Sequence, residues 1–125
     1  IKELAKIANL RNIPLLSHDD TQIETRDFFR KLGSKTTEFP MTAEVTQHAK
    51  NENDITVFGA PNVLRGVSHT GSVSASDMVE DGLCDVLASD YYYPALLGAI
   101  HKLHREAQSL VYKSFDPSGT FLLFR

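Results

Sequence analysis

The stretch IPLLSHDDTQIE, residues 13–24, decides the fold class, because a short apolar run is followed at once by polar residues and a helix start. Residues 13–17 predict a buried strand, which ends in the polar residues 18–20. Residues 21–24 match a capping box, in which a Thr or Ser precedes an acid by three positions. The helix that they begin is expected to end at Gly33. The stretch therefore predicts one β-α unit.

The same pattern recurs along the chain. Apolar runs predict strands at residues 13–17, 35–39, 55–59 and 85–89. Helices are predicted at 1–11, 21–32, 43–51, 74–82 and 94–112, with a long glycine-containing loop at 60–72. Thr42 and Ser74 are expected as N-caps, and Gly82 as the stop of the helix that Ser74 begins. His48, in the middle of its helix, is expected to be a surface residue. Short strands that alternate with helices indicate a parallel sheet with right-handed crossovers. Two architectures fit: an open doubly wound sheet, or part of a (β/α)8 barrel, which needs about 250 residues when whole.

Composition excludes several classes of protein. The chain has 125 residues, of which 42% are hydrophobic and 23% charged, a balance typical of one globular domain. The net charge of −3, with no basic block, argues against a nucleic-acid partner. No apolar run approaches the roughly 20 residues that span a bilayer, so no membrane association is expected. A lone cysteine, Cys84, forms no internal disulfide, which favours the cytoplasm, and it is expected to be buried and inert.

Polar side chains follow every predicted strand. They are His18, Asp19, Glu38, Asn62, Arg65, Ser68, His69 and Asp90. Because the carboxyl ends of parallel strands share one edge, these residues are expected to converge. Imidazole and carboxylate together suit Zn²⁺ or a similar ion, and a metal-bound water beside an Asp would be a hydrolytic centre. Each residue also has a structural alternative: His18 and Asp90 as helix caps, Glu38 as a partner of a nearby Lys, and His69 as a solvated loop residue.

The loop after the third strand has its own chemistry. Residues 59–71 contain three glycines, Arg65, several hydroxyls and an amide, and they lead to a helix N-terminus. Such a loop can hold phosphate oxygens, although it matches neither Walker A nor GxGxxG.

Four segments, in this order, closely resemble the PhnM family of the amidohydrolase superfamily. They are LSHDD at 16–20, TEFP at 37–40, GAPNVLRG at 59–66 with SHTG at 68–71, and ASDYY at 88–92. Members of the family act in phosphonate breakdown by the carbon–phosphorus lyase pathway. They hydrolyse α-D-ribose 1-methylphosphonate 5-triphosphate to the 5-phosphate and pyrophosphate. The resemblance extends over about residues 1–103.

The resemblance implies a metal-dependent (β/α)8 barrel, of which residues 1–112 would be the C-terminal half, a (β/α)4 unit. The tail at 113–125 lies outside the family pattern. The implied divalent metal is Zn²⁺, with Mn or Fe as alternatives, and the implied substrate is a phosphorylated ribose phosphonate. The implied roles are metal binding for His18 and Asp90, catalysis for Asp90, substrate binding for Asn62, Arg65, Ser68 and His69, and accessory roles for Asp19 and Glu38.

The chain also departs from the family, because the N-terminal half with its metal ligands and the small flanking β domain are not in this sequence. Catalytic zinc sites generally use three protein ligands, so we expect a truncated member that is inactive alone and in which the metal can be absent. The alternative is a non-catalytic half-barrel module that binds a phosphorylated ligand or self-associates. A half-barrel exposes two sheet edges, which predicts a homo-oligomer.

Overall fold

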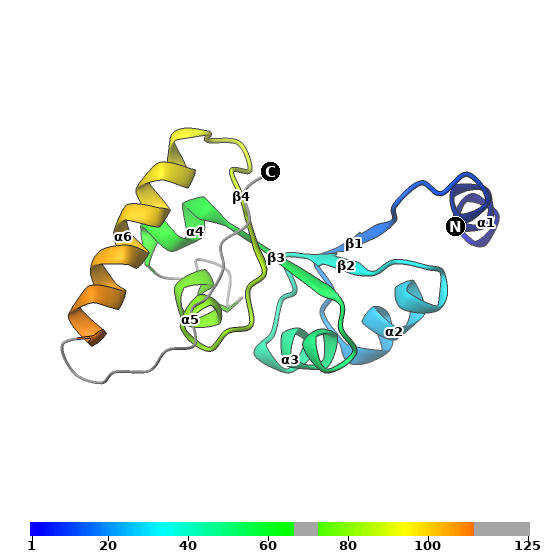
Figure 1. The fold of residues 1–125 in the computed structure, drawn as a ribbon. Helices are drawn as coiled ribbons and strands as arrows, with labels where there is room; N and C mark the ends of the chain where they lie inside the picture. Colours follow the sequence, from blue (N-terminus) through cyan, green and yellow to red (C-terminus); the bar gives the residue numbers. More distant parts are fainter. Residues whose placement is uncertain (67–72, 112–125) are drawn as a thin grey trace. The chain divides into compact units, whose positions relative to one another are not determined.

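The computed structural model describes residues 1–66 and 73–111 and confirms an α/β unit with four parallel strands in one sheet. The strand order is β1-β2-β3-β4 (Figure 1). The strands are β1 (Leu16–His18), β2 (Thr36–Glu38), β3 (Ile55–Gly59) and β4 (Val86–Ala88). The helices are α1 (Lys2–Leu10), α2 (Ile23–Lys31), α3 (Ala43–Asn51), α4 (Ala60–Arg65), α5 (Ala75–Glu80) and α6 (Pro94–Val111). Across the described ranges, no helix is apolar enough over sufficient length to cross a bilayer.

The structure corrects the expected start of α2. The predicted capping box at 21–24 is wrong, because the N-cap is Gln22, which makes no side-chain capping bond. The first helical hydrogen bond runs from the Arg26 amide to the Gln22 carbonyl. The caps expected at Thr42 and Ser74 are confirmed, since each side-chain oxygen accepts a bond from the amide three residues later.

A second correction concerns residues 60–65, which were expected in a loop and form α4. Pro61 lies in the first turn of this helix, where its missing N–H costs no hydrogen bond. The helix ends at Gly66, whose φ of 74° is left-handed. A six-residue helix lacks the long periodic pattern on which sequence analysis depends.

Four helices end in the same way. The second residue after α1, α2, α3 and α5 has a positive φ, and these residues are Asn12, Gly33, Asn53 and Gly82. In each case the following amide bonds back to the carbonyl five residues earlier, for example Ser34 N to Phe29 O at 3.1 Å. This is the Schellman motif. The two glycines were predicted as helix stops, whereas the two asparagines were not, because Asn is a weaker C-terminal signal than Gly.

Gly33→Ala is expected to destabilise the chain more than Gly82→Ala. Both positions have positive φ, which costs an L-residue about 1–2 kcal/mol. A Cβ at Gly33 would also lie 2.6 Å from Asn9 Oδ1, whereas a Cβ at Gly82 meets nothing within 4 Å. Moving Asn9 breaks its bond to the Leu32 carbonyl, an additional loss of about 1 kcal/mol. Urea unfolding of both variants measures the difference, and equal losses would contradict the Asn9 contact.

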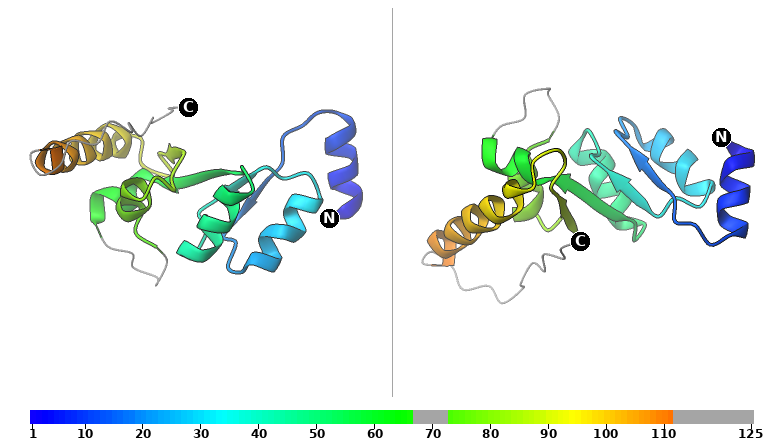
Figure 2. Two further views of the ribbon diagram at one scale, coloured as in Figure 1. Left: turned by 60° about the horizontal axis from the view of Figure 1, so that its bottom comes forward. Right: turned by 90° about the horizontal axis from the view of Figure 1, so that it is seen from above.

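The chain divides into two compact units, Ile1–Val57 (unit 1) and Phe58–Arg125 (unit 2), and each is described by itself. In unit 1, α2 and α3 lie side by side on one face of the strands (Figures 1 and 2). The strand residues under these helices are Ser17, Thr37 and Thr56, which are paired in register and buried. The interior of unit 1 is therefore polar along the strands.

The opposite face of unit 1 is open. Leu16 and Ile55 remain 56% and 47% exposed, and both pair in register with Thr36. The prediction of a buried first strand at 13–17 is thus wrong: the ladder covers 16–18, and Ile13 is also exposed. The strands present Ser17, Thr37 and Thr56 to the helices, whereas Leu16 and Ile55, with Thr36 between them, lie on the open face.

Unit 2 has an apolar interior. Its core joins β3, β4 and the three C-terminal helices through Phe58, Ala60, Val63, Ala75, Met78, Val79, Cys84, Leu87, Ala95, Ala99 and Leu103. Cys84 is buried, as predicted. The buried charged residues Asp20, Arg26 and Asp54 thus lie in unit 1, whereas the core of unit 2 is apolar.

Candidate functional site

The ends of β1 and β2 bring two predicted site residues together. His18 and Glu38 are directly paired in the parallel ladder, one residue beyond Ser17 and Thr37. They therefore lie on the open face of unit 1, because successive side chains of a strand point to opposite faces. His18 Nδ1 lies 2.9 Å from Asp19 Oδ2, so its other nitrogen, Nε2, is the one left to bind a metal. The arrangement offers an imidazole and a carboxylate side by side.

The backbone turns sharply just after these strands. Asp19 and Phe39 both have φ of 56°, and Asp90, two residues after β4, has φ of 53°. Such values are uncommon for residues other than glycine, above all for a bulky one such as Phe39, and they often mark functional sites. Backbone hydrogen bonds to the neighbouring strands fix the turns at Asp19 and Phe39. The Asp19 amide donates to the Glu38 carbonyl and the Phe39 amide to the Val57 carbonyl, each at 2.9 Å.

The ring of His18 packs on the ring of Phe39. The two ring centroids are 5.1 Å apart and the planes meet at 79°, an edge-to-face contact. The left-handed turn at Phe39 thus places an aromatic ring from β2 against the histidine of β1. Together with Asp19, this contact restricts the orientation of the imidazole.

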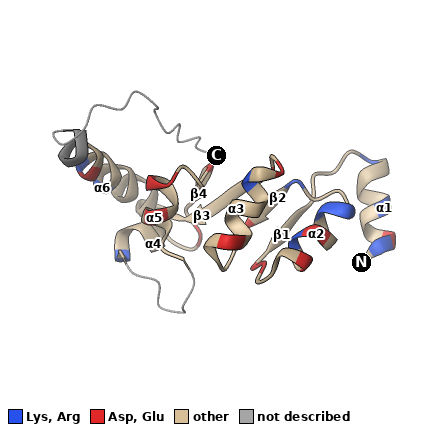
Figure 3. Cartoon of the chain, turned by 90° about the horizontal axis from the view of Figure 1, so that it is seen from below, with Lys and Arg blue, Asp and Glu red and all other residues tan. Residues whose placement is uncertain are grey.

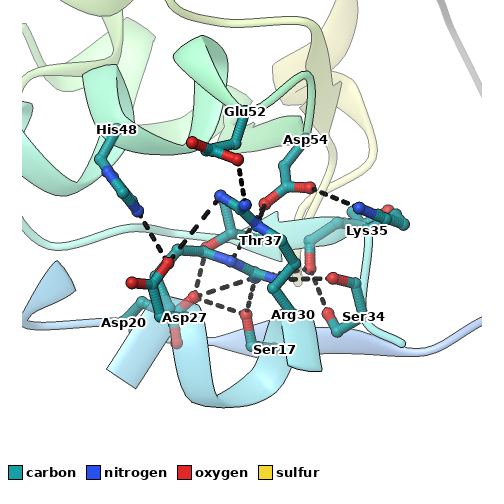
Figure 4. Close-up of polar contacts among 12 residues, drawn as sticks. Ser17, Asp20, Asp27, Arg30, Ser34, Lys35, Thr37, His48, Glu52 and Asp54 are labelled. Carbon is teal, nitrogen blue, oxygen red and sulfur yellow. Dashed lines mark hydrogen bonds and ion pairs between the residues drawn. The ribbon is translucent and has the colours of Figure 1, made fainter. Parts of the chain in front are cut away.

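A buried charged network lies under the same strand ends (Figure 4). Arg26 and Asp20 are both fully buried, and Arg26 Nη1 lies 3.2 Å from Asp20 Oδ2. Ser17 Oγ donates to the same oxygen at 2.5 Å, and Thr37 Oγ1 donates to it at 2.8 Å. Arg26 also donates to the Ser34 carbonyl at 2.6 Å. One carboxylate oxygen therefore joins β1, β2 and α2.

The network extends to the turn between α3 and β3 through Asp54, which is also buried. Its Oδ2 lies 3.3 Å from Arg26 Nε and accepts a 3.0 Å bond from Arg30 Nε. Arg30 also pairs with Glu52. Burial lowers the pKa of Arg30, but the hydrogen bond to Glu52 and the charge of Asp54 outweigh burial, so the net pKa is raised. The two buried carboxylates, Asp20 and Asp54, thus have guanidinium groups within ion-pair distance, as buried charges require.

A separate pair joins α2 and α3 nearer the surface. His48 Nε2 lies 2.8 Å from Asp27 Oδ1, and this hydrogen bond, followed by the charge of His48, lowers the pKa of Asp27 below its ordinary value of 3.8. Figure 3 shows charged residues of both signs on these two helices. His48 was predicted as a plain surface residue, and the structure shows it half-buried in a pair between helices.

In unit 2, the predicted phosphate-binding residues make contacts within the protein. Asn62 Oδ1 accepts a 2.9 Å bond from the Ala75 amide at the start of α5. Arg65, at the end of α4, donates to the Tyr91 hydroxyl at 3.0 Å. Asp90 is exposed beside Tyr91. The Arg65–Tyr91 bond therefore ties the end of α4 to the turn that carries Asp90. Ser68 and His69 lie outside the described residues.

The predicted ligands are of types that bind divalent metals, because imidazole and carboxylate are ordinary zinc ligands. His18 and Glu38 supply it in unit 1, and Asp90 belongs to unit 2. Within residues 1–66 and 73–107, no group of three or more His, Cys, Asp or Glu is gathered closely enough to hold a metal.

Sequence analysis missed the buried network of Asp20, Arg26 and Asp54. Arg26 is the only buried residue of α2, in a helix whose other residues are at least partly exposed. A single arginine in an otherwise exposed helix gives no sequence pattern that would predict its burial. The available signal was a hydroxyl residue in each of three successive predicted strands, at positions 17, 37 and 56, which leaves a polar space for a charge.

The chain is similar to part of a known enzyme. It is 38% identical over 102 residues to the alpha-D-ribose 1-methylphosphonate 5-triphosphate diphosphatase of Escherichia coli (strain K12). The match covers 82% of this chain and 27% of that enzyme, so the chain spans about a quarter of the relative's length. No family model and no solved structure matches the chain. The chain is thus related to a segment of this diphosphatase, as its motifs predicted.

Proposed function

We propose that residues 1–112 are the C-terminal half, four β-α units, of the barrel of a metal-dependent phosphohydrolase that releases pyrophosphate from a ribose 5-triphosphate phosphonate. The observation that carries the proposal is the pairing of His18 with Glu38 at the ends of two parallel strands, on the face of unit 1 where Leu16 and Ile55 are exposed. In a barrel this face would line the interior, and active sites lie at the carboxyl ends of the strands. The similarity to the diphosphatase supplies the reaction.

The proposed roles follow from the chemistry of each side chain. His18 and Asp90 would hold the metal, with Asp19 orienting the imidazole and Glu38 beside it. A divalent ion, with Zn²⁺ preferred over Mn or Fe, would supply a water that is more acidic than bulk water. Asp90 would accept a proton from the attacking water. Arg65 holds phosphate oxygens, aided by Asn62, Ser68 and His69.

The metal site is tested by titrating the purified chain with Zn²⁺ in a calorimeter. His18→Ala is expected to weaken binding about 100-fold or more, because it removes a ligand, and changes beside a ligand already cost 10–100-fold. His101→Ala is the control, since His101 is an exposed histidine of α6. Equal affinity in the wild-type chain and the His18→Ala variant would rule out His18 as a ligand.

The second candidate function is a non-catalytic half-barrel that self-associates, and the open face of unit 1 favours it. Leu16 and Ile55 are exposed there on the two strands that flank Thr36 of β2. The occupant that we propose is a second copy, because two four-stranded units together have the eight strands of a closed barrel. Light scattering at tens of micromolar should give a dimer that Leu16→Lys converts to a monomer. A wild-type monomer would contradict this proposal.

A further inference from the structure

We infer that Asp20 is a positioning residue for the His18–Glu38 pair, an inference that rests on the proposed function for its role in metal binding. The side chain of Asp20 points away from the open face and is fully buried. Its hydrogen bonds and ion pair are with Ser17, Thr37 and Arg26, and not with His18 or Glu38. Its action on the site would pass through the two strands that carry His18 and Glu38.

The contacts of Asp20 show how this works. The Ser17 and Thr37 hydroxyls donate to the same oxygen, Oδ2, from neighbouring strands. These two residues are paired in the ladder and immediately precede His18 and Glu38. The carboxylate therefore fastens β1 to β2 at the last step before the candidate ligands. The charge of Arg26 on Oδ2 strengthens the acceptor, because bonds to ionised groups are about twice as strong as neutral ones.

The backbone of Asp20 adds a further link between the two β-α turns. Its carbonyl accepts a 2.9 Å bond from the Met41 amide, which lies just beyond Phe39. Side chain and backbone of one residue thus hold both left-handed turns, at Asp19 and Phe39. The edge-to-face contact between His18 and Phe39 depends on the relative placement of these turns. Asp20 therefore controls the orientation of the His18 imidazole.

Two variants separate positioning from stability. Asp20→Asn keeps the shape of the side chain and removes its charge, whereas Thr37→Val removes the bond from β2 and leaves the Asp20–Arg26 ion pair in place. Asp27→Asn is the control, because it removes an aspartate of the same unit whose side chain pairs with His48 and Arg30 rather than with Asp20 or Arg26. Urea unfolding measures the stability of each variant, and circular dichroism confirms that it is folded.

The first readout is the NMR chemical shift of the His18 ring protons, which the Phe39 ring displaces from their position in the unfolded chain. In Asp20→Asn and in Thr37→Val we expect at least half of this displacement to be lost. The second readout is Zn²⁺ affinity, which should fall about tenfold or more. In Asp27→Asn the His18 chemical shift and the Zn²⁺ affinity should both match those of the wild type. If Asp20→Asn does not fold, Thr37→Val decides the question.

The outcomes distinguish this inference from the proposed function. Variants that lose stability but keep the His18 shift and the Zn²⁺ affinity would overturn it and leave Asp20 a structural residue. A wild-type chain that binds no Zn²⁺ would defeat the proposed metal site. A His18 shift that still responds to both variants would then support the positioning role by itself.

Discussion

Replacing Arg26 with Met is expected to lower the free energy of unfolding by about 3–5 kcal/mol, the cost of removing one partner from a buried ion pair. Arg26 is 0% exposed and reaches both Asp20 and Asp54. Asp54 keeps Arg30 as a partner after the change, whereas Asp20 keeps only two hydroxyl donors. The loss comes from the uncompensated charge on Asp20. Urea unfolding followed by circular dichroism measures it.

Two companion variants make this result specific. Arg11→Met removes an exposed arginine just after α1 and should change stability by less than about 0.5 kcal/mol. The double variant with Asp20→Asn and Arg26→Met leaves no unpaired charge at Asp20, so it should be more stable than Arg26→Met alone. An Arg26→Met chain as stable as Arg11→Met would show that the buried ion pair contributes nothing.

The second large effect concerns catalysis. In a full-length enzyme of the diphosphatase kind, changing the aspartate that aligns with Asp90 to Asn should reduce pyrophosphate release about 1000-fold, within the range for loss of a general base. Asn keeps the size of the side chain but cannot take a proton from the attacking water. The 125-residue chain alone is expected to release no pyrophosphate. A coupled assay for pyrophosphate, with the ribose 5-triphosphate phosphonate as substrate, measures both.

The control for this change is the residue that aligns with Asp77. Asp77 is an exposed aspartate in the first turn of α5, in the same unit as Asp90. Asp77→Asn removes an equal charge and should leave pyrophosphate release within twofold of the wild type. Turnover retained after the change at Asp90 would refute the role proposed for that carboxylate.

The strand-end residues of the candidate site could be located from the sequence because each follows an apolar run. His18, Glu38 and Asp90 do lie at or just after strands, and the pairing of His18 with Glu38 follows from the parallel order. The contacts of Asn62 with the Ala75 amide and of Arg65 with Tyr91 could not be predicted. They join residues 13 and 26 positions apart, across a region where the expected loop is partly the helix α4.

Local patterns were sufficient for the alternation of strands and helices, for the caps at Thr42 and Ser74, and for the stops at Gly33 and Gly82. Each of these depends on a few consecutive residues and on the backbone conformations that they allow. The face that a strand buries is a different matter, because hydrophobicity alone placed Leu16 inside, whereas the packing of α2 and α3 buried Ser17 and Thr37. A buried charge requires partners from several segments, and Arg26 obtains them from β1, the turn before β2, and the residue before β3. Those partners come together only when the chain folds, since burial without them would be prohibitively unfavourable.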